Sequence, residues 1–113
     1  MEMTFDERCR DFADWHTANP GIWKYFRRFA FEAVNRRRTR ISHWLIINRI
    51  RWEVSIMTTG VDFKISNDTI AFYARLWRAL HPEHRELFKV KLMAGEPVDQ
   101  PRYILKFLAN TAS

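Results

Sequence analysis

Cysteine, glycine and proline are scarce in this chain of 113 residues. The one cysteine, Cys9, has no partner for an internal disulfide, as expected of a protein kept in a reducing compartment. Its simplest role is that of a small buried side chain. Three glycines and four prolines are too few for the many turns of a β-sandwich or β-barrel, so the composition favours helices.

Long hydrophobic runs are absent as well. No stretch reaches the ~20 apolar residues that a membrane span needs, and the acidic N-terminal segment lacks the apolar core of a signal peptide. Apolar residues make up 47% of the chain and aromatic residues 15%, enough to fill a packed core. We therefore expect a single cytoplasmic domain over residues 1–113 that makes no membrane contact. Its core would span residues 5–92, followed by a loop and a C-terminal helix over 93–113.

Motifs for catalysis and metal binding are also missing. The sequence has no glycine-rich phosphate loop and no paired-carboxylate motif. His81 and His84 have a short spacing, but no cysteine pair completes a zinc site. Cys9 and His16 share a helix face without a third group to orient them. We therefore expect neither enzymatic activity nor a metal or cofactor, and we interpret His81 as a packing histidine whose hydrogen bonds are satisfied.

Helix-start signals divide the chain into elements. Thr4 and Glu7 have the spacing of a capping box. Asn19 before Pro20 combines an N-cap with a first helical residue. The predicted helices cover about residues 5–17, 20–35, 42–57 and 67–80, with Ser42 capping the third and Ser66 or Asn67 the fourth, and Pro101 opens a last helix. Residues 63–65 and 87–92 are candidates for short strands.

The third predicted helix, residues 42–57, is apolar around most of its circumference. Only Asn48, Arg51 and Ser55 form a narrow polar strip. Such a pattern is typical of a central helix that is covered on several sides. We expect a scaffold of buried residues that sets the angle between this helix and the next one: Trp44, Ile46, Ile50, Trp52, Tyr73 and Trp77.

Positive charge is concentrated in the middle of the chain. The net charge is +6, with −3 over residues 1–19, +7 over 20–56 and +2 over 57–113. Eight of the nine cations in the middle segment are arginines, whose forked guanidinium groups match phosphate oxygens and guanine edges. This predicts a polyanionic partner. The other interpretation is a solvated helix C-terminus, where cations are favourable in any case. The four arginines that we expect to hold phosphate are Arg36, Arg37, Arg38 and Arg40.

The order of elements is that of a winged helix-turn-helix domain: a mainly α bundle of about five helices with at most a small β-hairpin. In that architecture the helix over residues 67–80 would lie in the major groove of DNA. Its short polar start suits base and phosphate contacts, although the same residues form an ordinary N-cap. The contacts expected from this part of the chain are Lys64, Asn67, Thr69, Arg75 and Arg78.

Phe72 lies on the predicted outer face of the helix over residues 67–80. An exposed phenylalanine there would be a partner-binding anchor or a homodimer contact. The same side chain would instead be buried if the C-terminal helix covers it.

Several short motifs carry a resemblance to a known family. They are Asn19-Pro20, Ile-Arg-Trp-Glu at residues 50–53, Phe-Lys-Ile-Ser-Asn at 63–67 and Tyr-Ala-Arg at 73–75. Over about residues 5–90 the chain resembles a family of small proteins of tailed bacteriophages and prophages with a winged-helix-like pattern. The resemblance implies a phage origin, hence a host bacterial cytoplasm, and a DNA-binding-like fold. It supplies no catalytic residue, cofactor or target.

The hypothesis from the sequence is a non-catalytic protein that grips double-stranded DNA, as a small phage regulator. RNA in place of DNA remains open, as does a homodimer. The alternative is a protein-interaction module that binds and inhibits or redirects a host protein or defence complex, because fold does not dictate function.

Overall fold

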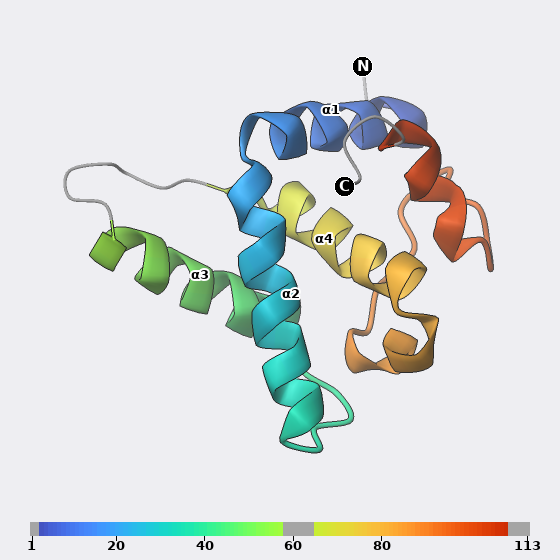
Figure 1. Ribbon diagram of the computed structural model, residues 1–113. Helices are drawn as coiled ribbons and strands as arrows, with labels where there is room; N and C mark the ends of the chain where they lie inside the picture. The colour runs from blue at the N-terminus through green and yellow to red at the C-terminus, as the bar shows by residue number, and fades with distance from the viewer. Residues whose placement is uncertain (1–2, 58–64, 109–113) are drawn as a thin grey trace.

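The computed structural model describes residues 3–57 and 65–108. This part of the chain is mainly helical and contains no β-strand. Four α-helices follow one another along the chain, and two 3₁₀-helices come after them (Figure 1). Their bounds are α1 Phe5–Ala18, α2 Pro20–Asn35, α3 His43–Met57, α4 Asn67–Leu80, η1 Pro82–Leu87 and η2 Pro101–Phe107.

The helices begin where local capping chemistry predicts. The Thr4 hydroxyl accepts a hydrogen bond of 3.1 Å from the backbone N–H of Glu7, which confirms the cap of α1. The Ser66 hydroxyl accepts one of 3.1 Å from the N–H of Thr69 and caps α4. Asn19 stands at the N-cap of α2 without such a bond, because its amide donates instead to a backbone carbonyl of α1. The starts of α1 and α4 are therefore determined within a few residues of sequence.

The central helix is α4. It packs against α1, α2, α3, η1 and η2, and Figure 1 shows it running through the middle of the molecule below α1 and behind α2. Nine of its 14 residues are buried. Tyr73 and Trp77 are completely buried, so their predicted role as scaffold is confirmed. Five further rings stack on or edge against Tyr73 at centroid distances of 4.8–6.1 Å, and they belong to Phe12, Trp15, His16, Trp23 and Phe26.

The prediction that the third helix is central and covered is wrong. Among the α3 side chains that the structure describes, the buried ones lie on one side and include Ile46 and Ile50, whose scaffold role is confirmed. Trp44, Leu45 and Trp52 are 40%, 64% and 67% exposed, so the two tryptophans do not belong to the scaffold. Figure 1 shows α3 extending away from the body of the molecule, with α2 crossing in front of it. An apolar circumference did not mean burial here, because the described elements cover α3 on one side.

The segment after α4 is irregular rather than a wing. The segment predicted as a strand, residues 87–92, begins at the last residue of the 3₁₀-helix η1 and forms no β-ladder in the described part of the chain. One backbone hydrogen bond of 2.8 Å, from Ile41 N–H to the Leu87 carbonyl, ties this segment to the start of α3. The other strand candidate, residues 63–65, lies mostly outside the described residues. The β-hairpin of a winged helix is therefore not confirmed, whereas the mainly helical class is.

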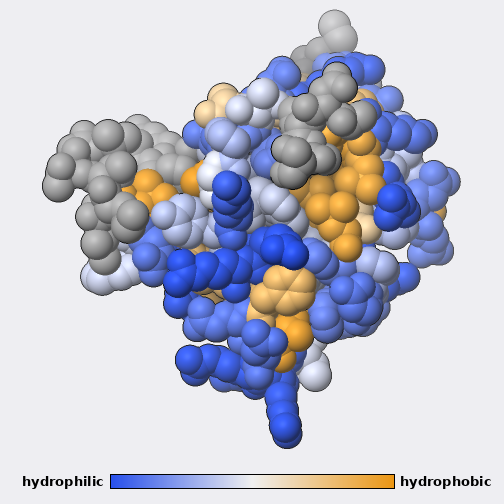
Figure 2. Space-filling model, viewed as in Figure 1, coloured by the Kyte–Doolittle hydropathy of each residue, from blue (hydrophilic) through white to orange (hydrophobic). Residues whose placement is uncertain are grey.

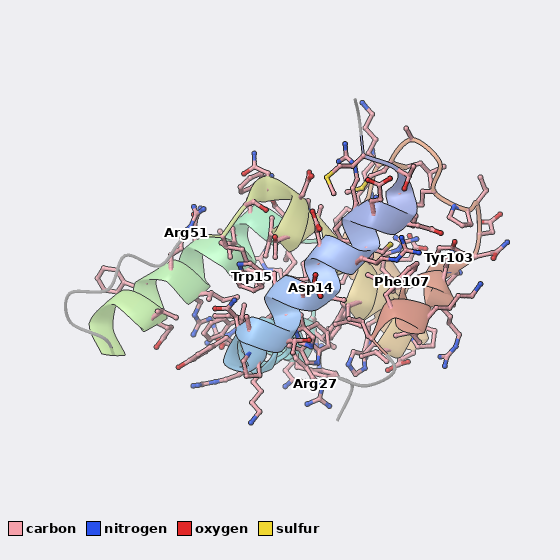
Figure 3. The ribbon with its side chains drawn as sticks, turned by 90° about the horizontal axis from the view of Figure 1, so that it is seen from above. Asp14, Trp15, Arg27, Arg51, Tyr103 and Phe107 are labelled. Atoms are coloured by element: carbon pink, nitrogen blue, oxygen red, sulfur yellow. The ribbon has the colours of Figure 1, made fainter. Side chains whose placement is uncertain are left out.

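The C-terminal element docks on the chain's own core. Ile104 and Leu108 are buried, and η2 packs against α4 and α1. The Tyr103 hydroxyl donates a hydrogen bond of 2.7 Å to the Asp6 carboxylate, and Figure 3 shows Tyr103 and Phe107 side by side next to α1. Residues 101–107 therefore close one end of the aromatic core.

Candidate nucleic-acid interface

The arginine-rich turn after α2 has the backbone of a Schellman motif. The N–H of Arg37 donates to the Val34 carbonyl at 2.9 Å, and the N–H of Arg38 donates to the Ala33 carbonyl at 3.0 Å. Arg37 adopts a φ of 61°, in the left-handed region. Glycine is the usual residue at this position, because a side chain in this conformation is disfavoured. The turn therefore keeps an arginine where backbone energetics favour glycine.

The arginines of this turn are exposed and weakly paired. All residues from 35 to 40 are exposed. Arg36 lies 3.9 Å from the Glu32 carboxylate and Arg40 lies 3.5 Å from that of Glu86, both across solvent-exposed surface. The two arginines that directly follow Arg36 form no ion pair with any described residue. Exposed pairs of this kind contribute little stability, so the turn is available to an outside anion.

Helices α2 and α3 extend the positive charge on two different sides. Lys24, Arg27 and Arg28 are exposed on α2, and Figure 2 shows strongly hydrophilic side chains across the middle of this face and at its lower end, with a hydrophobic patch between them. Figure 3 shows Arg27 and Arg51 pointing to opposite sides of the molecule. The basic turn, residues 36–40, connects these two helices along the chain.

The exposed side of α3 was not predicted. It carries Trp44, Leu45 and Trp52, together with the exposed Asn48. Exposed apolar side chains that gather on one face mark interaction surfaces. The signal was available in the sequence, because a helix that is apolar all round needs cover on every side and a chain of this length provides few covering elements.

Arg75, predicted as a contact in a DNA groove, is buried within the fold. This residue is only 6% exposed. Its Nε and Nη2 donate to the two carboxylate oxygens of Glu96 at 2.8 Å each. The guanidinium also donates to the Ala71 carbonyl at 3.0 Å and to the Lys91 carbonyl at 2.8 Å. Arg75 therefore holds the segment before η2 against α4 and has no free face for nucleic acid.

Phe72, expected to be either an exposed partner anchor or a covered side chain, is buried. Phe72 is 1% exposed and its ring packs against Phe12 and Phe5 of α1, with centroid distances of 5.4 and 5.8 Å. The face of α4 that the sequence assigned to solvent is thus covered by α1 and by the segment that Arg75 holds. A helix covered in this way does not enter a major groove.

The remaining predicted contacts of the α4 region fall into three groups. Arg78 is half-buried and donates to the Arg85 and Phe88 carbonyls at 3.3 and 3.1 Å, so its guanidinium serves the fold. Thr69 is buried, and its hydroxyl lies 2.8 Å from that of Ser66 within the cap. The third group comprises the last two residues: Asn67 is exposed at the start of α4, and Lys64 lies outside the described residues.

Cys9 and His16 are core residues. The Cys9 side chain is completely buried, as expected, and burial together with the nearby Asp6 and Glu96 carboxylates raises the pKa of its thiol to about 12. The Nδ1 of His16 forms a buried hydrogen bond of 2.8 Å with the Tyr73 hydroxyl. A thiol with so high a pKa is protonated at neutral pH and is a poor nucleophile.

His81 packs as predicted but is not fully hydrogen-bonded. Its ring lies against Phe31 and Trp77, at centroid distances of 4.8 and 4.4 Å. Burial and the nearby Arg27 lower the pKa of His81, so the ring is neutral at pH 7. Its Nε2 has no hydrogen-bond partner among the residues that the structure describes, which corrects the expectation that this side chain is satisfied.

The described part of the chain contains no cluster of metal-ligating side chains. No three His, Cys, Asp or Glu side chains there lie close enough to hold a metal ion. None of the described helices combines the length and the apolar character that a membrane crossing requires. The chain matches no family model, no curated protein and no solved structure, so its resemblance to small tailed-phage proteins stays a prediction from the sequence.

Proposed function

We propose that this protein binds nucleic acid without catalysis, through phosphate contacts made by the arginine turn over residues 36–40. The observation that carries the proposal is the left-handed conformation of Arg37. A side chain in this conformation costs about 1–2 kcal/mol relative to the right-handed region. Backbone strain of this kind clusters at functional sites. An arginine held there directs a cation into solvent, where phosphate can reach it.

The distribution of charge supports the same proposal. The segment from residue 20 to residue 56 carries a net charge of +7, whereas residues 1–19 carry −3. Helices α2 and α3 with their connecting turn are therefore a basic arm on a body whose α1 is acidic. Such an asymmetry orients a polyanion toward the arm during diffusional encounter. Binding of this type depends on released counterions and weakens steeply as salt rises.

Burial of α4 changes the mode of binding that the sequence predicts. A helix covered by α1 and held by Arg75 cannot present base contacts in a major groove. Phosphate contacts remain available, and these are independent of base sequence. We therefore propose binding with little sequence preference, in the setting of the small phage protein that the resemblance implies.

Removing two arginines of the turn tests the phosphate contact. We expect Arg37→Ala combined with Arg38→Ala to weaken binding roughly 10–100-fold at ~0.05 M salt, on every base sequence alike. The slope of log affinity against log salt should fall in magnitude by about 1.4–1.8, since each lost phosphate contact removes ~0.7 on a single strand and ~0.9 on a duplex. Fluorescence anisotropy of labelled oligonucleotides across a salt series measures both quantities.

A second double variant controls for the loss of charge. Arg10 of α1 and Arg102 of η2 are exposed and lie outside the basic arm. Arg10→Ala combined with Arg102→Ala removes the same net charge, and we expect it to leave the salt slope nearly unchanged. Equal losses for the two double variants would mean that overall charge, and not the turn, drives binding.

Glycine at position 37 separates fold stability from binding. We expect Arg37→Gly to raise the free energy of unfolding by about 0.5–1 kcal/mol, because glycine relieves the left-handed strain despite its greater freedom in the unfolded chain. The same variant should weaken nucleic-acid binding by removing the guanidinium. Urea denaturation and the anisotropy titration measure the two effects. A more stable variant with wild-type affinity would remove Arg37 from the interface.

A further inference from the structure

We propose that the strand bound by this protein is single and that its bases stack on Trp44 and Trp52, on the exposed face of α3. The inference rests on the proposed function, because it takes the basic turn as the phosphate-holding part of the same interface. It adds the class of nucleic acid and the residues that select it.

The two tryptophans are placed to act together. Trp44, Asn48 and Trp52 recur at intervals of four residues, so they lie along one face of the helix. At ~1.5 Å per residue the two indoles stand about 12 Å apart along the helix axis. Trp44 is 40% exposed and Trp52 is 67% exposed. Exposed aromatic rings in a row are the stacking platform that single-stranded nucleic acid requires.

Arginines border this face on both edges. The helical positions of Arg51 and Arg49 fall on either side of the Trp44–Trp52 row. Arg51 is anchored by hydrogen bonds of 3.3 Å to the Ile65 carbonyl and 3.4 Å to the Asn48 side chain. Arg49 lies 2.9 Å from the Glu32 carboxylate and stacks over Phe29 at 4.2 Å, yet its side chain is still 44% exposed. Rings flanked by cations suit bases that are joined to phosphates.

The stacking face and the basic turn are continuous along the chain. Arg40 ends the turn, and α3 begins at His43, so Trp44 lies four residues after the last arginine. The Ser42 hydroxyl accepts a hydrogen bond of 3.1 Å from the Trp44 N–H, which fixes the first turn of α3 at this point. A strand whose phosphates lie on the turn therefore has its next bases within reach of the indoles.

Charge identifies nucleic acid as the occupant of this face. A second copy of the chain would bring two segments of net charge +7 together, which is unfavourable, whereas a polyanion is complementary. A duplex hides its base faces inside the stack, and α4 is too buried to read a groove. An unpaired strand exposes the π-faces of its bases to tryptophan, which makes it the better partner of the two.

The test compares a single strand with the duplex of the same sequence, using labelled oligonucleotides of about 20 residues, longer than the ~4–16 nucleotides that a small single-strand-binding module covers. We expect tighter binding to the single strand and quenching of tryptophan fluorescence when it binds. Trp52→Ala should weaken single-strand binding about 5–150-fold, the equivalent of ~1–3 kcal/mol per lost base stack. It should change duplex affinity less than twofold. Trp52→Phe, which keeps a ring, should retain most of the single-strand affinity.

Leu45→Ala is the matched control. Leu45 is 64% exposed on the same face but has no ring, so its loss should change single-strand affinity less than twofold. Leu45 and Trp52 are both exposed, so we expect the two variants to stay folded, and circular dichroism measures whether they do. Equal losses of affinity for Leu45→Ala and Trp52→Ala would overturn stacking. So would equal affinities for strand and duplex that Trp52→Ala leaves unchanged. In either case the face is an apolar docking surface for a protein. If the wild type binds neither strand nor duplex at low salt, the proposed function fails together with this inference.

Discussion

Replacing Arg75 with alanine is expected to lower the free energy of unfolding by about 3–5 kcal/mol, the range for removing one partner of a buried ion pair. The side chain is 7% exposed and its partner Glu96 is 13% exposed. In the native protein the guanidinium donates to the Glu96 carboxylate and, through Nη2, to the Lys91 carbonyl. Alanine removes both interactions and leaves these acceptors without their donor. Since native domains are stable by only about 5–15 kcal/mol, this single change removes a large part of the total.

Denaturant unfolding of three variants measures the effect and its cause. Arg75→Lys keeps the charge but loses the two-pronged geometry, so we expect an intermediate loss. Arg85→Ala is the control, because Arg85 lies at the exposed surface and its change should stay within ~0.5 kcal/mol. If Arg75→Ala leaves stability intact but weakens nucleic-acid binding, Arg75 is a groove contact after all and its burial has been misread.

Replacing Phe72 with alanine is expected to destabilise the fold by about 3–5 kcal/mol, as for other buried phenylalanines. The ring is 1% exposed and fills the space between α4 and two rings of α1, those of Phe5 and Phe12. Truncation leaves a cavity beside the Arg75–Glu96 pair, because Phe72 also lies 5.7 Å from the Arg75 guanidinium carbon. A residue that anchored an outside partner would instead tolerate alanine with little change in stability.

Phe72→Leu keeps the prediction testable if the alanine variant does not fold. Leucine retains most of the apolar contact, so we expect a loss of only about 1–2 kcal/mol. Leu45→Ala on α3 removes a comparable apolar side chain from an exposed position and should cost less than ~0.5 kcal/mol. Thermal or urea unfolding of the three proteins gives the comparison. A loss for Leu45→Ala as large as that for Phe72→Ala would place α3, and not α4, in the core.

The two helices exchange the roles that a winged-helix interpretation assigns to them. The helix over residues 67–80 was expected to bury one face and offer the other to DNA, and it forms the centre, while the helix over 42–57 was expected inside and exposes two tryptophans. This exchange moves the proposed interface from α4 to the turn and α3. The arginine turn belongs to both interpretations, because its exposure does not depend on which helix is covered.

The sequence by itself determined the capped helix starts, the mainly helical class and the exposed arginine turn, because each depends on residues that are close together along the chain. A cap at Thr4 or Ser66 needs only a hydroxyl and an N–H three residues later, so neighbours along the chain are enough to decide it. A run of arginines likewise stays in water because the charge is costly to bury without a partner.

Only the tertiary structure decided which helix is central and which charges are buried. Periodicity marks the apolar residues of a helix but does not say whether another element covers them, so the exposed Trp52 and the buried Phe72 were both misplaced. Arg75 looked like a surface cation because the carboxylate that neutralises it, Glu96, stands 21 positions further along the chain. Pairing at that separation arises when the segment before η2 folds back on α4, and that is a property of the packed molecule.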